Sequence, residues 1–137
     1  MDERGRLADA RVARLATVSG DGMPHLVPVV FALVGDVVWS AVDAKPKTTR
    51  RLRRLANIEQ TGRASLLVDA YDEDWSTLWW VRVDGPAQVL PADDVGAAAG
   101  IDALVAKYPQ YREHRPGGPV VAVHCQTWRS WSASPGG

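Results

Sequence analysis

Six segments of the chain have the length and the apolar pattern of β-strands. The expected strands cover residues 11–19, 24–34, 37–42, 63–72, 78–90 and 119–133. The sequence Asp21-Gly22 and the sequence Gly35-Asp36 separate the first three strands, and Asp-Gly is typical of a tight hairpin. The first three strands are therefore predicted to form an antiparallel meander.

The second expected strand is apolar on both of its faces. One face carries Leu26, Val30, Ala32 and Val34, and the other carries Val27, Val29, Phe31 and Leu33. A strand of this kind lies inside a sandwich or barrel, or has one face under a helix, a ligand or a partner chain. Pro28 cannot donate to a sheet ladder, so we expect an edge or a bulge there. Such interruptions often expose backbone to a ligand.

Three segments are predicted to be helical, at 2–10, 47–60 and 91–107. In the middle one, Leu52, Leu55 and Ile58 recur at helical spacing, and Thr48 or Thr49 can cap its start. Loops are expected at 73–77 and 108–118. Mostly strands in meander order, with a few helices, predict a mainly β fold, a small closed β-barrel. The length of 137 residues fits a single domain over 1–137.

The positive charge of the chain is concentrated in one short segment. The chain has 16 basic and 16 acidic residues, so a general affinity for nucleic acid or for a membrane surface is not expected. Six cations and no acid nevertheless lie within 45–54: Lys45, Lys47, Arg50, Arg51, Arg53 and Arg54. They surround the expected start of a helix, where free N–H groups and the dipole attract anions. Either this segment cradles a phosphate or it is a solvated helix face.

The sequence offers few other candidates for metal-binding or catalytic residues. His25, His114 and His124 lie on different expected elements without metal-ligand spacing, so no metal site is predicted. Cys125 lies within an expected strand and is interpreted as a buried structural cysteine. Any enzymatic chemistry would therefore come from a bound cofactor. The single cysteine and an N-terminus without a signal-peptide pattern favour a cytoplasmic protein. No run of about 20 apolar residues suggests a membrane helix.

Five segments together carry a resemblance to a known family. They are ARLATVSGDGMPHLVPVVFAL (13–33), GDVVWSAVDAKPKTTRRLRRLANI (35–58), RASLLVD (63–69), LWWVRVDGPAQVL (78–90) and WRSW (128–131). In this order they resemble the pyridoxamine 5'-phosphate oxidase-like split β-barrel family, in its actinobacterial branch of deazaflavin (coenzyme F-420) dependent oxidoreductases. The arginine-to-lysine flavin motif of the pyridoxamine oxidases themselves is not found, which argues against oxidation of pyridoxamine phosphate.

The resemblance implies a six-stranded barrel that forms a homodimer, with each cofactor in a groove at the interface. The cofactor-binding positions carried over from the family are Pro28, Val29 and Val30 beside the ring, Ser40 and Val42 along the groove, Lys45, Lys47, Arg50 and Arg51 at the phosphate and acidic tail, and Trp79, Trp80 and Arg82 from the partner chain or on the substrate side. The apolar 24–34 strand and the Trp-rich 78–81 and 128–131 segments also favour a dimer.

The implied activity is hydride transfer between F-420 and a small-molecule substrate. Two alternatives remain open: an FMN-dependent oxidoreductase of the same fold, and a non-catalytic carrier of a cofactor or haem. No catalytic residue is assigned, although His25, Tyr71 and Arg82 are candidate proton donors, and solvent could also serve.

Overall fold

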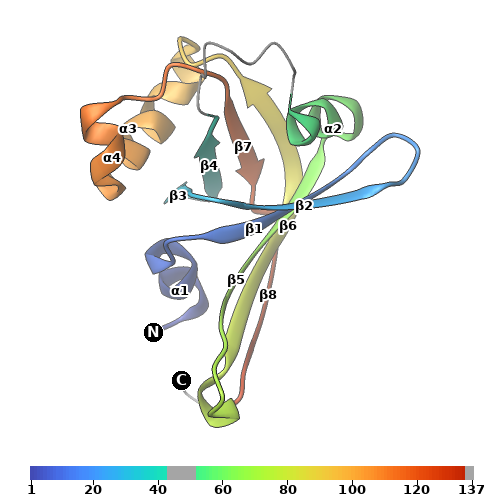
Figure 1. Cartoon of the computed structure of the whole chain (residues 1–137), viewed down its shortest axis with the longest axis vertical. Coiled ribbons are helices and arrows are strands. Elements are labelled where there is room, and N and C mark those ends of the chain that lie inside the picture. The colour runs from blue at the N-terminus through green and yellow to red at the C-terminus, as the bar shows by residue number, and fades with distance from the viewer. Residues whose placement is uncertain (43–51, 135–137) are drawn as a thin grey trace.

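The computed structural model describes residues 1–42 and 52–134, which form one curled antiparallel sheet with helices packed on it (Figure 1). The helices are α1 (Glu3–Asp9), α2 (Arg53–Thr61), α3 (Ala98–Lys107) and α4 (Pro109–Glu113), with 3₁₀ turns η1 (Trp75–Thr77) and η2 (Val95–Ala97). The strands are β1 (Ala13–Val18), β2 (Pro24–Val29), β3 (Ala32–Val34), β4 (Val37–Ala41), β5 (Arg63–Ala70), β6 (Trp79–Leu90), β7 (Val120–His124) and β8 (Thr127–Ser132). The predicted mainly β fold is confirmed.

The segment 24–34, which was predicted as one strand, divides into β2 and β3, and this division accompanies the curling of the sheet. The strand order is β2-β1-β5-β6-β7-β4-β3, so β2 and β3 lie at opposite ends of the sheet although they follow one another in the chain. Between them, Val30 and Phe31 are not in strand conformation. β2 pairs only with β1 among the described strands, so Pro28, opposite Arg14, faces a free edge where its missing N–H costs no ladder bond.

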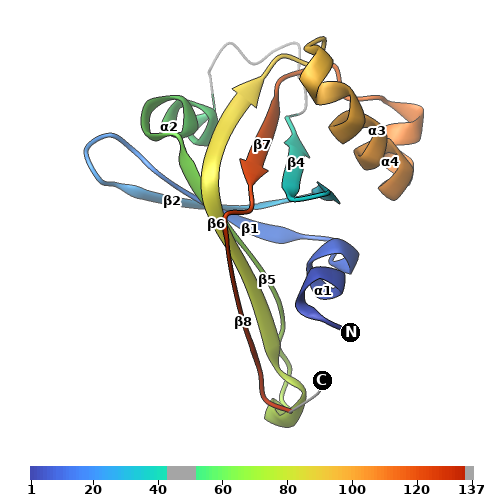
Figure 2. The ribbon, with the colours of Figure 1, turned by 180° about the vertical axis from the view of Figure 1, so that it is seen from behind.

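A second predicted strand also divides. Residues 119–133 form β7 and β8, which both pair with the long strand β6: β8 with Trp79–Asp84 and β7 with Ala87–Leu90. Gly85 lies between the two pairings, and a Cβ at this position would stand 1.8 Å from the carbonyl oxygen of His124. Only glycine leaves room for this close approach of two backbones. The half of β6 that pairs with β8 forms a long arm with β5 (Figure 2).

Two apolar clusters stabilise the sheet. The larger one includes Phe31, which lies between β2 and β3, and Leu55 and Ile58 from α2. The smaller one lies under α3 and includes Trp39 of β4, Ile101 and Leu104. The apolar positions of α2 and α3 recur at spacings of three and four residues, so each helix buries one stripe.

The helices differ from expectation at their ends. α2 begins at Arg53 because Leu52 is extended, so the predicted start at 47 is wrong and neither Thr48 nor Thr49 is its cap. The helix expected over 91–107 begins only at Ala98, after the turn η2 that the side chain of Asp94 caps. The loop expected at 108–118 contains the short helix α4. Among the described residues, no helix is long and apolar enough to cross a membrane.

Candidate functional site

The predicted ring-side residues gather at the corner between β2 and β3. Ser40 of β4 donates a hydrogen bond from its Oγ to the carbonyl oxygen of Val30 at 3.0 Å. Val29 and Val42 both belong to the larger core cluster, with 7% and 8% of their surface exposed. Pro28 is exposed on the edge strand. At this corner a ligand would therefore meet Pro28 and backbone, because the Val29 and Val42 side chains point into the core.

The backbone of the corner is bonded by side chains instead of by a neighbouring strand. The β1–β2 ladder ends at Val29 and the β3–β4 ladder begins at Ala32. Between them, the N–H of Phe31 donates to the phenol oxygen of Tyr108 at 3.1 Å, and the same phenol lies 2.9 Å from the Phe31 carbonyl oxygen. Tyr108 is the residue that sequence analysis missed. It was assigned to a loop, and nothing in its neighbourhood along the chain points to a residue 77 positions away.

The predicted anion-binding cations Lys45, Lys47, Arg50 and Arg51 lie outside the described residues. The end of the basic segment is described, and it forms the first turn of α2 through Arg53 and Arg54. This turn contains no acidic residue, and no side chain caps it. Cations at a helix N-terminus oppose its dipole unless an anion lies among them. Arg53 and Arg54 thus place two cations at the start of α2, and the carboxylate of Asp21 interacts electrostatically with Arg53.

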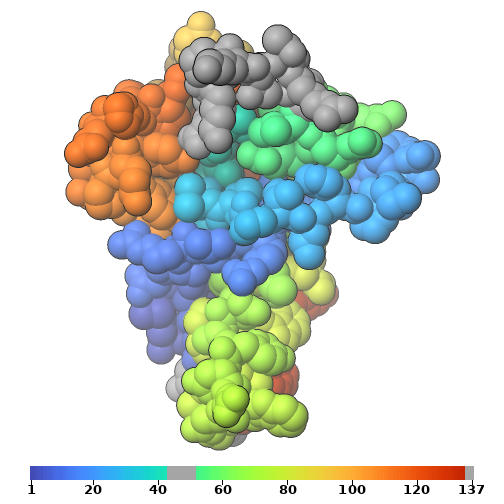
Figure 3. Space-filling model, viewed as in Figure 1, coloured from blue at the N-terminus to red at the C-terminus, as the bar shows by residue number. Residues whose placement is uncertain are grey.

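The remaining predicted residues lie on the β5–β6–β8 arm. Trp79 packs partly on the larger core cluster, and its ring lies 4.7 Å from the guanidinium of Arg6. Trp80 faces Trp131 across the β6–β8 ladder. Figures 1 and 2 show this arm extending away from β4 and α2, so one chain does not bring these tryptophans to the corner. In the space-filling view the arm also stands apart from α3 and α4 (Figure 3).

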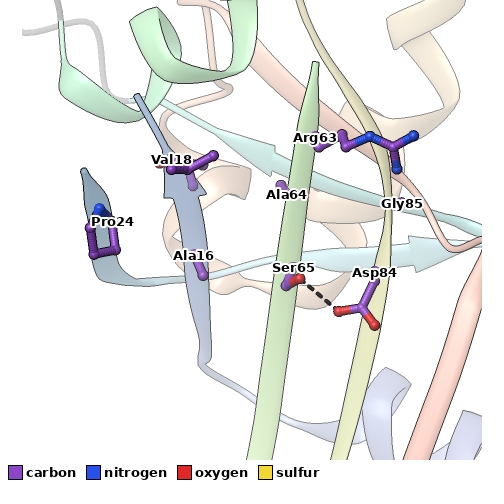
Figure 4. Close-up of a pocket in the computed structure, with 9 residues that line it drawn as sticks. Ala16, Val18, Pro24, Arg63, Ala64, Ser65, Asp84 and Gly85 are labelled. Carbon is purple, nitrogen blue, oxygen red and sulfur yellow. Dashed lines mark hydrogen bonds between the residues drawn. The ribbon is translucent and has the colours of Figure 1, made fainter. Parts of the chain in front are cut away.

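One face of the sheet carries both exposed apolar residues and a hollow. A cross-strand row runs through Leu26, Ala16, Ser65, Asp84 and Thr127, and the neighbouring row runs through Pro28, Arg14, Leu67, Arg82 and Arg129. The hollow has a volume of about 350 Å³ and is lined by Ala16, Thr17, Val18, Pro24, Arg63, Ala64, Ser65, Asp84 and Gly85 (Figure 4).

Ser65 and Asp84 form a polar side of this hollow, and Arg82 contacts Asp84 from outside the lining. Ser65 donates to the Asp84 carboxylate at 2.6 Å, and Arg82 donates to the same carboxylate at 3.0 Å. Both donors and the acceptor belong to β5 and β6, so the rigid sheet holds them. None of the described residues predicted to bind the cofactor lines the hollow, which is therefore distinct from the β2–β3 corner.

The prediction that Cys125 is a buried cysteine is confirmed. Cys125 is buried, and burial raises the pKa of its thiol to about 11, so it stays protonated near neutral pH. The described residues contain no group of three or more His, Cys, Asp and Glu side chains that could hold a metal ion. His25 has a buried Nδ1 without a hydrogen-bond partner in the described part of the chain.

Solved structures share this fold. A conserved hypothetical protein, Rv2991 from Mycobacterium tuberculosis, is 22% identical with a TM-score of 0.75, over 97% of this chain and 86% of that one. A haem-binding protein from Mycobacterium smegmatis is 20% identical with a TM-score of 0.76, and this chain spans 54% of its length while 98% of this chain is covered. An FAD-binding protein from Mesorhizobium loti is 22% identical with a TM-score of 0.68, over 93% of this chain and 89% of that one.

These identities show a common fold and no more. A search of curated proteins finds no match to the chain. The family model for pyridoxamine 5'-phosphate oxidase, in contrast, matches residues 3–132. That match covers nearly the whole chain, including both halves of the curled sheet. The chain therefore belongs to the pyridoxamine 5'-phosphate oxidase family of split-barrel proteins.

Proposed function

We propose that this protein is an oxidoreductase that binds the deazaflavin coenzyme F-420 at the β2–β3 corner and exchanges hydride with a small-molecule substrate. One observation carries the proposal. The Ser40–Val30 hydrogen bond joins the corner to β4, and β4 leads through Val42 directly into the basic segment. The surface for a flat ring is thus bonded to the strand that directly precedes, in the sequence, the run of cations proposed for the anionic tail.

The ring side of this site is simple. Pro28 offers an exposed apolar surface on an edge strand and has no N–H that would need a partner. Val30 is held through its carbonyl oxygen by Ser40, so the corner is fixed before a ligand arrives. A preformed surface loses little conformational entropy when it binds, which favours affinity.

Binding of the anionic part of the cofactor would depend on the basic residues of the chain. Lys45, Lys47, Arg50 and Arg51 would hold the phosphate and the acidic tail, and Arg53 adds a further cation on the first turn of α2, which itself contains no acidic residue. A single phosphate needs two or three cations, whereas a phosphodiester with a polyglutamate tail can use more. For this reason we expect F-420 to bind better than FMN. Exposed ion pairs contribute only about 0–1 kcal/mol each, so the preference should weaken with salt.

Bound deazaflavin would supply hydride chemistry, because it has carbon where flavin has N5. The protein would hold the substrate against the ring face and exclude water from the reacting atoms. Trp79, Trp80 and Arg82 would contribute to the substrate side from a second copy of the chain, since one chain keeps them away from the corner.

We also propose that the protein is a homodimer. On the open sheet face, Leu26 is 66% exposed, and Trp131 is 45% exposed on the same face. Large apolar side chains that stay exposed on a sheet face often mark an interface. Light scattering at micromolar concentration should give twice the chain mass of 14.9 kDa, and a clean species of 14.9 kDa would contradict the proposal.

Two other functions are supported by specific relatives of the fold. The FAD-binding protein from Mesorhizobium loti favours a flavin enzyme, here one that uses FMN. The haem-binding protein from Mycobacterium smegmatis and HutZ, a haem storage protein from Vibrio cholerae that is 12% identical with a TM-score of 0.70, favour a carrier. Consumption of reduced cofactor with candidate acceptors separates an enzyme from a carrier.

The test of the proposal is a side-by-side titration of the purified protein with F-420, FMN and haemin, followed by absorbance and fluorescence. We expect the tightest binding for F-420, weakened by added salt. Tighter binding of FMN, or a yellow flavin that co-purifies with the protein, would favour the flavin enzyme. Binding of haemin alone would favour the carrier.

A charge reversal tests whether the basic segment binds the anionic part of the cofactor. Lys47→Glu should weaken F-420 binding strongly, because a charge-assisted contact is lost and a carboxylate repels the anion. The matched control is Arg112→Glu on α4, which makes the same change of two charges away from α2. Arg53 is unsuitable as a control because it lies on the first turn of α2. Equal affinities for both variants and the parent, at low salt, would show that the basic segment does not bind the anionic part of the cofactor.

A further inference from the structure

The β2–β3 corner depends on one side chain from a distant part of the fold. Val30 and Phe31 lie between two ladders, and buried backbone groups in such a gap need other partners. The phenol of Tyr108, at the junction of α3 and α4, approaches three backbone atoms: the Phe31 nitrogen at 3.1 Å, the Phe31 oxygen at 2.9 Å and the Arg11 oxygen at 3.0 Å.

The phenol can serve these atoms because it accepts and donates at once. It accepts the Phe31 N–H, and its single proton is shared between the carbonyl oxygens of Phe31 and Arg11. Tyr108 is 7% exposed. Burial raises the pKa of the Tyr108 phenol above its ordinary value, so the group keeps its proton throughout the physiological range. The bond therefore ties the corner to the segment that enters β1.

The surroundings of Tyr108 hold its ring in place. The Lys107 ammonium lies 4.1 Å from the centre of the Phe31 ring and donates to the Ala10 carbonyl oxygen at 2.7 Å. The guanidinium of Arg11 lies 5.6 Å from the centre of the Tyr108 ring and donates to the Lys107 carbonyl oxygen at 3.1 Å. α3 and the segment before β1 thus clamp the corner from one side while Ser40 holds Val30 from β4.

From this arrangement we infer that Tyr108, acting with Ser40, is a positioning residue for the cofactor ring. The inference rests on the proposed function, which puts the ring beside Pro28 and Val30. Tyr108 reaches the ring only through the backbone of Phe31, one residue after Val30. Without the phenol oxygen, the buried N–H of Phe31 loses its partner, and the corner must shift to regain one. A shifted corner would present a different surface to the ring.

The experiment compares Tyr108→Phe, Ser40→Ala and the parent. We expect each variant to bind F-420 about three to ten times more weakly, as the loss of one hydrogen bond would give. We also expect the absorbance band of the bound cofactor to shift, and the Phe31 amide to exchange its hydrogen faster in Tyr108→Phe. If Tyr108→Phe does not fold, Ser40→Ala, which removes the other bond to the corner, carries the test.

The control separates positioning from a general loss of stability. Thr17→Val removes a buried hydrogen bond of similar kind, in which Asn57 donates to Thr17 at 3.1 Å, at the opposite end of β1 from the corner. It should lower stability and leave cofactor affinity and absorbance unchanged. Affinity that is unchanged in Tyr108→Phe and Ser40→Ala, or that falls equally in Thr17→Val, would overturn the inference. A parent that binds none of the three cofactors would instead overturn the proposed function, and this inference with it.

Discussion

Replacement of Gly100 by alanine sets two opposite effects against each other at the contact between α3 and β4. Gly100 faces the indole of Trp39, and a Cβ added there would lie 2.2, 2.4 and 2.6 Å from Cδ2, Cγ and Cε2 of the ring. Alanine is the better helix former, so helix propensity alone predicts a more stable protein. Packing predicts the reverse, because the added methyl group overlaps a rigid ring.

The size of each effect decides the sign. Exchange of glycine for alanine inside a helix contributes about 1 kcal/mol. Overpacking a close-packed core costs about 1–3 kcal/mol. Three atoms of a rigid ring are contacted at once, and Trp39 is only 7% exposed, so we take the upper end of this range. The free energy of unfolding should therefore fall by about 2 kcal/mol.

Urea unfolding followed by circular dichroism and tryptophan fluorescence measures this change. Ala99→Gly, on the exposed side of the same helix, calibrates the propensity effect and should cost up to about 1 kcal/mol. In a Trp39→Leu background the obstacle is gone, so adding Gly100→Ala should leave stability equal or higher. A Gly100→Ala protein as stable as the parent would refute the packing argument, because α3 would then be free to move away from β4.

Three further predictions concern other parts of the fold. Gly85→Ala should cost about 3 kcal/mol or more in thermal unfolding, since its Cβ would meet the His124 backbone; an unchanged melting temperature would contradict this. Cys125, buried with its pKa raised to about 11, should react with a thiol reagent at pH 8 only after unfolding, so rapid labelling of the native protein would show that it is accessible. Burial lowers the pKa of Lys107 to about 8 from 10.5, so the unfolded chain binds more protons above pH 8 and stability should rise with pH. The rise should be clearest between about pH 8 and 9, before Cys125 opposes it, and should be absent in Lys107→Met; an equal rise in both proteins would exclude Lys107 as its source.

The sequence predicted the class of fold because the strands carry a local signal. Short apolar segments, bounded by Asp21-Gly22 and Gly35-Asp36, located the hairpins that the structure contains. The break at Val30 could not be found this way, since the residues on both sides remain apolar, and the residues around the break at Cys125 contain no glycine or proline that would mark a turn. Both breaks arise from pairing: β6 is shared by β7 and β8, and β2 and β3 pair at opposite ends of the sheet.

Some features of the candidate site could likewise be predicted from the sequence, and others could not. The basic segment is contiguous, so its charge could be recognised directly in the sequence. The start of α2 was misplaced, because Thr48 and Thr49 offered good caps although the helix begins after Leu52 without a side-chain cap. The role of Tyr108 at the corner depends on a contact across 77 residues, and only the packing of α3 and α4 creates it.

The separation of the corner from the basic segment suggests how one fold can serve several cofactors. At the corner, the chain offers backbone, Pro28 and an apolar surface, and these suit any flat ring. Charge, which would distinguish one anionic tail from another, comes from the segment between β4 and α2. The rest of the selectivity would come from the β5–β6–β8 arm of a second copy, whose tryptophans lie away from the corner in their own chain. We therefore expect substitutions at Tyr108 and Ser40 to weaken F-420 and FMN alike, whereas Lys47→Glu should weaken F-420 more. A change of preference between the two cofactors in Tyr108→Phe would show that the corner itself selects the ring.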